Sequence, residues 1–148
     1  MQSVLKGLPT KSMVIEVLVL NNCNLKDEGF AMILEGLIHQ DCLSSITYAK
    51  DEFGPKSMEQ LEIIRNLEAQ EKSAKSISSI AFQEIKMGES IKTRFVETVK
   101  NFAMLRKLKI SGINLTDVRV FQGVYEIVKD SQFQFNLSSL DLSGSCFT

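Results

Sequence analysis

The feature that most limits how this chain can fold is an eleven-residue pattern that occurs five times. The first copy, IEVLVLNNCNL, starts at Ile15 and carries apolar aliphatic residues at its positions 1, 4, 6 and 11. Further copies start at Leu43, Ile77, Leu105 and Leu137, so successive starts lie 28, 34, 28 and 32 residues apart. Self-similarity at a period of about 20–50 residues is the signature of a repeat protein. The pattern therefore predicts about five repeats.

Positions 4 and 6 of each copy have the two-residue alternation of a β-strand, so both side chains point to the same side. We therefore expect one short strand in each copy. The predicted strands lie near residues 17–20, 45–48, 79–82, 107–110 and 139–142.

Each predicted strand except the last is followed by apolar residues at helical spacing. The residues expected to face the core are Phe30, Ile33, Leu34, Leu37; Met58, Leu61, Ile64, Leu67; Ile91, Phe95, Val99, Phe102; and Phe121, Val124, Ile127, Val128. Pro55 suits the first turn of the second helix, and Thr116 is the predicted N-cap of the fourth. The extra residues of the longest copy are expected to extend the helix after Pro55.

A single strand and helix cannot bury both apolar faces, but a stack of such units forms a continuous core. Helices are wider than the strand spacing of about 4.8 Å. The stack is therefore expected to curve, with a parallel sheet inside and the helices outside.

The copies resemble the leucine-rich repeat, LxxLxLxx(N/C)xL, and the copies with full helices resemble its ribonuclease-inhibitor-like class. The resemblance implies an α/β leucine-rich-repeat solenoid, and it covers nearly all of residues 1–148. Ser3–Leu8 (SVLKGL) is similar to Met32–Leu37 (MILEGL), and the sequence given stops just after the fifth predicted strand. We therefore interpret residues 1–148 as one solenoid segment and expect it to be part of a longer protein.

Composition narrows the classes of partner. The net charge of −1 gives no electrostatic reason to expect nucleic acid or an anionic membrane. No apolar run approaches the roughly 18 residues needed to span a bilayer. The three cysteines lack paired motif spacing, which favours reduced thiols in an intracellular compartment. We expect a cytoplasmic protein whose partners are other proteins, with no nucleic acid and no membrane insertion.

Cys23, between two asparagines, has two interpretations: a nucleophile or metal ligand, or a buried side chain at position 9 of the repeat. The single histidine, His39, lies elsewhere, and no four ligands for zinc converge in the sequence. Phosphate-binding and nucleophile-elbow motifs are also absent. The sequence therefore favours the buried side chain, and it predicts no catalytic residue, no cofactor and no metal. The carboxylates at the strand-to-helix turns are interpreted as stabilising helix N-termini: Asp27, Glu28, Asp51 and Glu52.

The remaining candidate site is the concave face of the expected sheet, where strand positions 3, 5, 7 and 8 should point. The candidate protein contacts are Val17, Val19, Asn21, Thr47, Lys50, Gln83, Glu84, Lys107, Lys109 and Asp141. These residues include no Trp, Tyr or Arg, the types that usually dominate interface energy. Helix faces, loops and the ends of the stack therefore remain alternative surfaces.

The resemblance implies a non-catalytic scaffold or adaptor within a multi-subunit assembly, in settings such as cytoskeletal regulation or ciliary complexes. Tropomodulin and the actin capping-protein linkers are similar to this class. Two alternatives remain: a GTPase-activating protein of the Ran type, and an enzyme inhibitor. An arginine or asparagine patch on one edge loop would favour GTPase activation.

Overall fold

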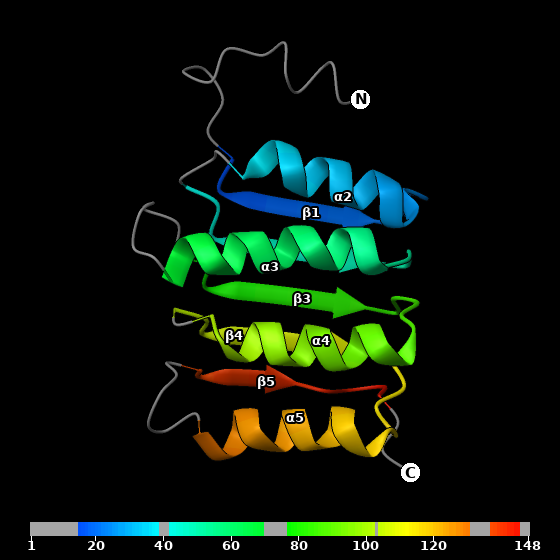
Figure 1. Ribbon diagram of the computed structural model, residues 1–148, viewed down its shortest axis with the longest axis vertical. Coiled ribbons are helices and arrows are strands. Elements are labelled where there is room, and N and C mark those ends of the chain that lie inside the picture. The colour runs from blue at the N-terminus through cyan, green and yellow to red at the C-terminus, as the bar shows by residue number, and fades with distance from the viewer. Residues whose placement is uncertain (1–14, 39–41, 70–76, 103, 131–136, 146–148) are drawn as a thin grey trace.

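The computed structural model describes residues 15–38, 42–69, 77–102, 104–130 and 137–145, in which strands and helices alternate along the chain (Figure 1). The strands are β1 (Val17–Asn21), β2 (Ser45–Ala49), β3 (Ser79–Gln83), β4 (Lys107–Ser111) and β5 (Ser139–Asp141). The helices are α2 (Lys26–Leu37), α3 (Pro55–Ala69), α4 (Glu89–Lys100) and α5 (Val118–Asp130). Each of the five predicted strands is confirmed.

The five strands form one parallel sheet whose order follows the sequence, β1-β2-β3-β4-β5. The register pairs equal positions of the repeat pattern. Position 3 forms one row across the sheet, made of Val17, Ser45, Ser79, Lys107 and Ser139. The predicted α/β class with a parallel sheet is confirmed.

Alternate strand residues are buried on the side of the sheet that the helices cover. In β2, Ile46 and Tyr48 are buried, and Ile80 and Phe82 are buried in β3. They pack into one apolar cluster with helix residues such as Leu34 of α2. The remaining strand side chains lie on the opposite face, which is partly or fully exposed over most of its area.

Five aromatic rings link the first three repeats inside this core. Phe30 stacks on Tyr48 with ring centroids 3.8 Å apart and an interplanar angle of 9°. Phe53 contacts Phe82 edge-on at 5.1 Å, and Phe82 contacts Phe95 at 4.6 Å. Such pairs contribute about 0.5–1.5 kcal/mol each beyond the area that they bury. The core therefore runs from one repeat into the next without interruption.

Serine hydroxyls join neighbouring strands just before β2, β3 and β5 begin. Ser44 Oγ donates to the carbonyl oxygen of Glu16, and Ser78 Oγ donates to that of Ser44. Ser138 Oγ donates in the same way to Arg106. The recurring triplets LSS, ISS and LSS at three repeat starts were the sequence signal for this arrangement.

Position 8 of every copy of the pattern has a left-handed backbone conformation, and in the first four copies it directly follows the strand. Its φ angle is 56° at Asn22, 56° at Lys50, 50° at Glu84, 66° at Gly112 and 73° at Gly144. This conformation turns the chain out of the sheet towards the helix. It also lets the N–H at position 8 donate to the next strand, as Lys50 does to the Gln83 carbonyl oxygen at 2.9 Å.

The fourth helix differs from its prediction. Asp117, not Thr116, is the N-cap, because its Oδ1 accepts the backbone N–H of Arg119 at 2.8 Å. With that start the helix turns Val120 towards the core. The prediction that Phe121 and Val128 face the core is wrong, because their side chains are 48% and 54% exposed.

The other helices follow their predictions closely. Pro55 is the first residue of α3, which is the longest described helix at 15 residues. Of the expected core residues in α2 and α3, Ile33 and Leu67 are only half-buried. The predicted helix residues Ser3–Leu8 lie outside the described residues.

Candidate interaction surface

The ten predicted contact residues belong to the five strands or directly follow them. Val17, Val19, Asn21, Lys50, Glu84 and Lys107 are exposed, whereas Thr47, Gln83, Lys109 and Asp141 are half-buried. Parallel pairing in register brings those within the strands onto one face. Lys50 and Glu84 instead lie one residue beyond their strands, in the left-handed turn.

Two rows of side chains cross this face from β1 to β5. The first is the position-3 row, from Val17 to Ser139. The second is the position-5 row, which consists of Val19, Thr47, Ala81, Lys109 and Asp141. Apolar side chains thus stand at one edge, small ones in the middle, and lysines on β4.

An ion pair joins β4 and β5 on this face. Lys109 Nζ lies 3.8 Å from Asp141 Oδ2, with both side chains partly exposed. An exposed pair at this distance contributes little to stability, because water screens it. Asp141 Oδ1 also accepts the N–H of Ser143 at 2.9 Å, and this hydrogen bond lowers the pKa of the carboxyl.

The carboxylate of Asp27 supports the neighbouring helix rather than its own. Its oxygens accept the N–H groups of Gly54 at 2.9 Å, Lys56 at 3.1 Å and Ser57 at 2.8 Å, around the start of α3. Ser57 Oγ donates in return to the carbonyl oxygen of Asp27 at 2.9 Å. Lys56 also pairs with Glu28 at 2.7 Å. These contacts anchor α3 to the first turn of α2.

Asp51, which follows β2, supports the start of the earlier helix α2, just as Asp27 in α2 supports the start of the later helix α3. Its carboxylate accepts the N–H groups of Leu25 at 2.7 Å and Lys26 at 2.8 Å, where α2 begins, and that of Glu52 at 2.9 Å. The residue is 8% exposed. Asp27 and Asp51 thus form a reciprocal carboxylate exchange, in which each carboxylate stabilises the helix start of the neighbouring strand-and-helix unit.

Both carboxyl groups have lowered pKa values. Burial alone would raise the pKa of Asp51, but hydrogen bonds from the N–H groups of Leu25 and Lys26 outweigh burial and lower it. For Asp27 burial also raises the pKa, and the bonds from Ser57 and its neighbours reverse the direction. Both groups are therefore ionised at neutral pH, and their surroundings give them a structural role.

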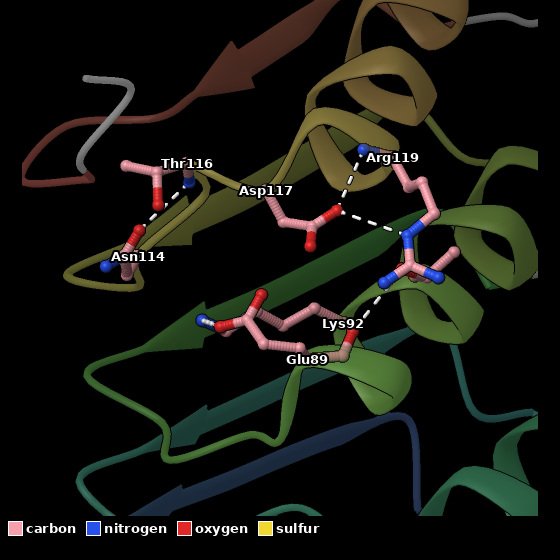
Figure 2. Close-up of polar contacts among 7 residues, drawn as sticks. Glu89, Lys92, Asn114, Thr116, Asp117 and Arg119 are labelled. Carbon is pink, nitrogen blue, oxygen red and sulfur yellow. Dashed lines mark hydrogen bonds and ion pairs between the residues drawn. The ribbon is translucent and has the colours of Figure 1, made fainter.

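Several polar side chains lie at the starts of α4 and α5 and in the turn before α5 (Figure 2). Lys92 pairs with Glu89 at 2.9 Å, and Asn114 Oδ1 accepts the N–H of Thr116 at 2.9 Å. Asp117 Oδ1 lies 3.4 Å from Arg119 Nε. Asn114 lies in the turn before α5 and Arg119 in the first turn of that helix, and each makes a local contact: Asn114 with Thr116, and Arg119 with Asp117.

Cys23 is exposed, so its predicted burial is wrong. Its Sγ lies 3.6 Å from the carbonyl oxygen of Asn21. β1 is an edge strand of the described sheet, whereas position 9 is buried in interior copies such as Ile85 and Ile113. Within the described part of the chain, no three His, Cys, Asp or Glu side chains form a group that could hold a metal. His39 and Cys146 lie outside that part.

An exposed apolar stripe on α5 was missed by the sequence analysis. Phe121, Tyr125 and Val128 are 48%, 51% and 54% exposed. Their spacing of four and three residues places them on one side of the helix. The helical spacing of apolar residues had led to the prediction that Phe121 and Val128 face the core.

Comparison with models of known protein families found no match, and no curated protein is significantly similar to the chain in sequence. None of the helices in the described ranges is long and apolar enough to cross a membrane.

Proposed function

We propose that this chain is a non-catalytic protein-interaction scaffold: a leucine-rich-repeat solenoid segment that binds other proteins within a multi-subunit assembly. One observation carries this proposal. The strand register aligns equal positions of five sequence copies on a sheet face that the helices leave uncovered. A repeated, uncovered sheet face is the kind of extended surface that solenoids use for binding.

The solenoid assignment is supported by the pattern of contacts. Each strand pairs only with its neighbours in sequence, and among the described helices contacts occur only between those that are neighbours in sequence. The exchange between Asp27 and Asp51 is likewise a contact between adjacent repeats. Nearest-neighbour contact of this kind defines a stack of repeats.

The proposed location is the cytoplasm, in a cytoskeletal or ciliary assembly. Cys23 and Cys42 are free and exposed, which suits a reducing compartment. The proposed partners are proteins rather than nucleic acid or membrane, in keeping with the net charge of −1.

Site-specific photo-crosslinking tests the proposal. A photo-reactive amino acid replaces Thr47 on the sheet face and, as the matched control, Glu97 on the exposed side of α4. In cells that express the protein, we expect Thr47 to give one discrete crosslinked partner, identified by mass spectrometry, and Glu97 to give none. Equal labelling from both positions, or no product from Thr47, would contradict binding by the sheet face.

GTPase activation is the catalytic alternative, and its candidate residues are Asn114, in the turn before α5, and Arg119, in the first turn of that helix. Stimulated GTP hydrolysis by Ran, lost in Arg119→Ala, would replace the scaffold proposal. An enzyme inhibitor would instead form a tight one-to-one complex that blocks a soluble enzyme.

A further inference from the structure

We infer that the uncovered sheet face binds a short acidic segment of a partner protein, with an apolar residue over β1 and a carboxylate at β4. This inference rests on the proposed function, because it names the chemistry of the partner at the same surface. It follows from how apolar, small and basic side chains are distributed across the five strands.

The β1 edge of the face is apolar. Val17 and Val19 are 58% and 61% exposed, and they lie two residues apart on the same side of the strand. When a partner removes the surface of such side chains from water, the free energy of the complex falls. Their cross-strand neighbours Ser45 and Thr47 are small, so a partner's apolar side chain has room beside them.

The middle of the face lets a partner backbone approach closely. The outward residues of β2 and β3 in the two rows are Ser45, Thr47, Ser79 and Ala81, all half-buried. None has a side chain long enough to hold a partner away from the sheet. Three of them carry hydroxyl groups, which can donate to or accept from a peptide backbone.

The β4 part of the face is basic. The outward residues of β4 in the two rows are Lys107 and Lys109, and the only acidic side chain in these rows is Asp141, which pairs with Lys109. Across the described residues, Lys107 is exposed and makes no ion pair. Its Cα partners on either side are Ser79 and Ser139. An ammonium between two hydroxyls is a set of donors that suits a carboxylate.

The sheet spacing sets the length of the bound segment. β1 and β4 are three strand spacings apart, which is about 14 Å. An extended chain advances about 3.3 Å per residue. A segment that crosses the strands therefore needs its apolar residue and its Asp or Glu about four residues apart.

A phage-displayed library of random peptides, selected on the 148-residue chain, tests this inference. We expect enriched peptides to carry an aliphatic or aromatic residue followed about four residues later by Asp or Glu. Enrichment of peptides without this pair, or of basic peptides, would overturn the inference.

Binding of one enriched synthetic peptide is then measured with two charge-reversal variants. Lys107→Glu should weaken binding by about tenfold or more, because it places like charges together. Lys129→Glu makes the same charge change on exposed α5 and should leave the affinity unchanged. Thermal unfolding followed by circular dichroism checks that both variants remain folded. Replacing the peptide's acidic residue by lysine should restore binding to Lys107→Glu.

Equal losses in both variants, or equal competition by a single-stranded RNA, would show non-specific anion binding and overturn the inference. The photo-crosslink at Thr47 separates the two proposals. If the crosslinked partner persists unchanged in Lys107→Glu, the sheet face still binds protein, and only the acidic chemistry of the segment is wrong.

Discussion

The turns that follow β2 and β4 both lead from a five-residue strand to a helix, and different side chains hold them in place. After β2, position 9 of the repeat is Asp51, whose carboxylate accepts three N–H groups. After β4, position 9 is Ile113, which is 2% exposed in the apolar core. The same place in the stack is thus filled by a hydrogen-bonded carboxylate in one turn and an apolar side chain in the other.

The two turns also differ at position 8, directly before these residues. Lys50 has a φ of 56°, a conformation that disfavours side chains with a Cβ, whereas Gly112 has a φ of 66° without that cost. The first turn therefore combines a strained residue with strong hydrogen bonds, and the second relies on glycine and burial. Equal backbone geometry does not require equal residues, because different interactions can stabilise it.

The largest expected effect comes from removing the carboxylate of the first turn. Asp51→Ala leaves the N–H groups of Leu25, Lys26 and Glu52 without their acceptor, and should lower the free energy of unfolding by about 3 kcal/mol. Urea unfolding measures the loss. The control Asp141→Ala, on a more exposed carboxylate, should change stability by less than about 0.5 kcal/mol. Equal losses would contradict a special role for Asp51.

The contact between α4 and α5 tests whether close apolar packing stabilises the part of the molecule around β4. A Cβ added at Gly123 would lie 2.5 Å from Val96 Cγ1. Gly123→Val should therefore cost about 2 kcal/mol by overpacking, measured by urea unfolding. The exposed neighbour provides the control, since Gln122→Val should be close to neutral. Adding Val96→Ala to Gly123→Val should recover part of the loss; no recovery would argue against the close contact as the cause.

A fall in pH should destabilise α2 and α3, which Asp27 and Asp51 anchor, before it destabilises α4 and α5. The pKa values of Asp27 and Asp51 are lowered in the folded protein, so their contribution is fully present above the unfolded value of about 3.9. It is lost as the pH falls through the lower folded values. Hydrogen exchange at decreasing pH should show α2 and α3 losing protection before α4 and α5. In Asp51→Asn this difference between the regions should shrink; an unchanged difference would mean that other groups cause it.

The smallest expected effect concerns the left-handed residue. Lys50→Gly should raise stability by about 1 kcal/mol, because glycine adopts the φ of 56° without a steric cost. Thermal unfolding measures the shift. Ser45→Gly, within the regular part of β2, should instead lower stability by about 0.5–1 kcal/mol. A loss of the same size from both substitutions would contradict strain at Lys50.

The strands were predictable because their signal is local and repeated. Apolar residues at positions 4 and 6, such as Ile46 and Tyr48, are required wherever a short strand packs under a helix, so the sequence retains the pattern. Pro55 was equally informative, since its fixed φ and missing N–H suit a helix start. Periodicity alone did not fix the phase of α5, because both Val120 and Phe121 are apolar, and the cap at Asp117 decides between them.

The carboxylate exchange could not be read from sequence in the same way. Asp27 was expected to favour a helix start, yet the helix that it supports begins 28 residues later, at Pro55. Finding that partner requires the strand register, which depends on the whole sheet. Exposure of Cys23 depends similarly on its position in an edge turn. The ten residues of the candidate surface followed from alternation within the strands, and their role as contacts stays a prediction.

Sequential strand order also has a mechanical consequence. Every strand in the described sheet pairs with strands that are adjacent in the chain, so a force that pulls β1 away from β5 passes through each strand pair in series. Parallel strands pulled in this way are peeled apart bond by bond rather than sheared all at once. The strand-and-helix units would therefore be released one after another, and each released unit would lengthen the chain while the remaining strands stay paired.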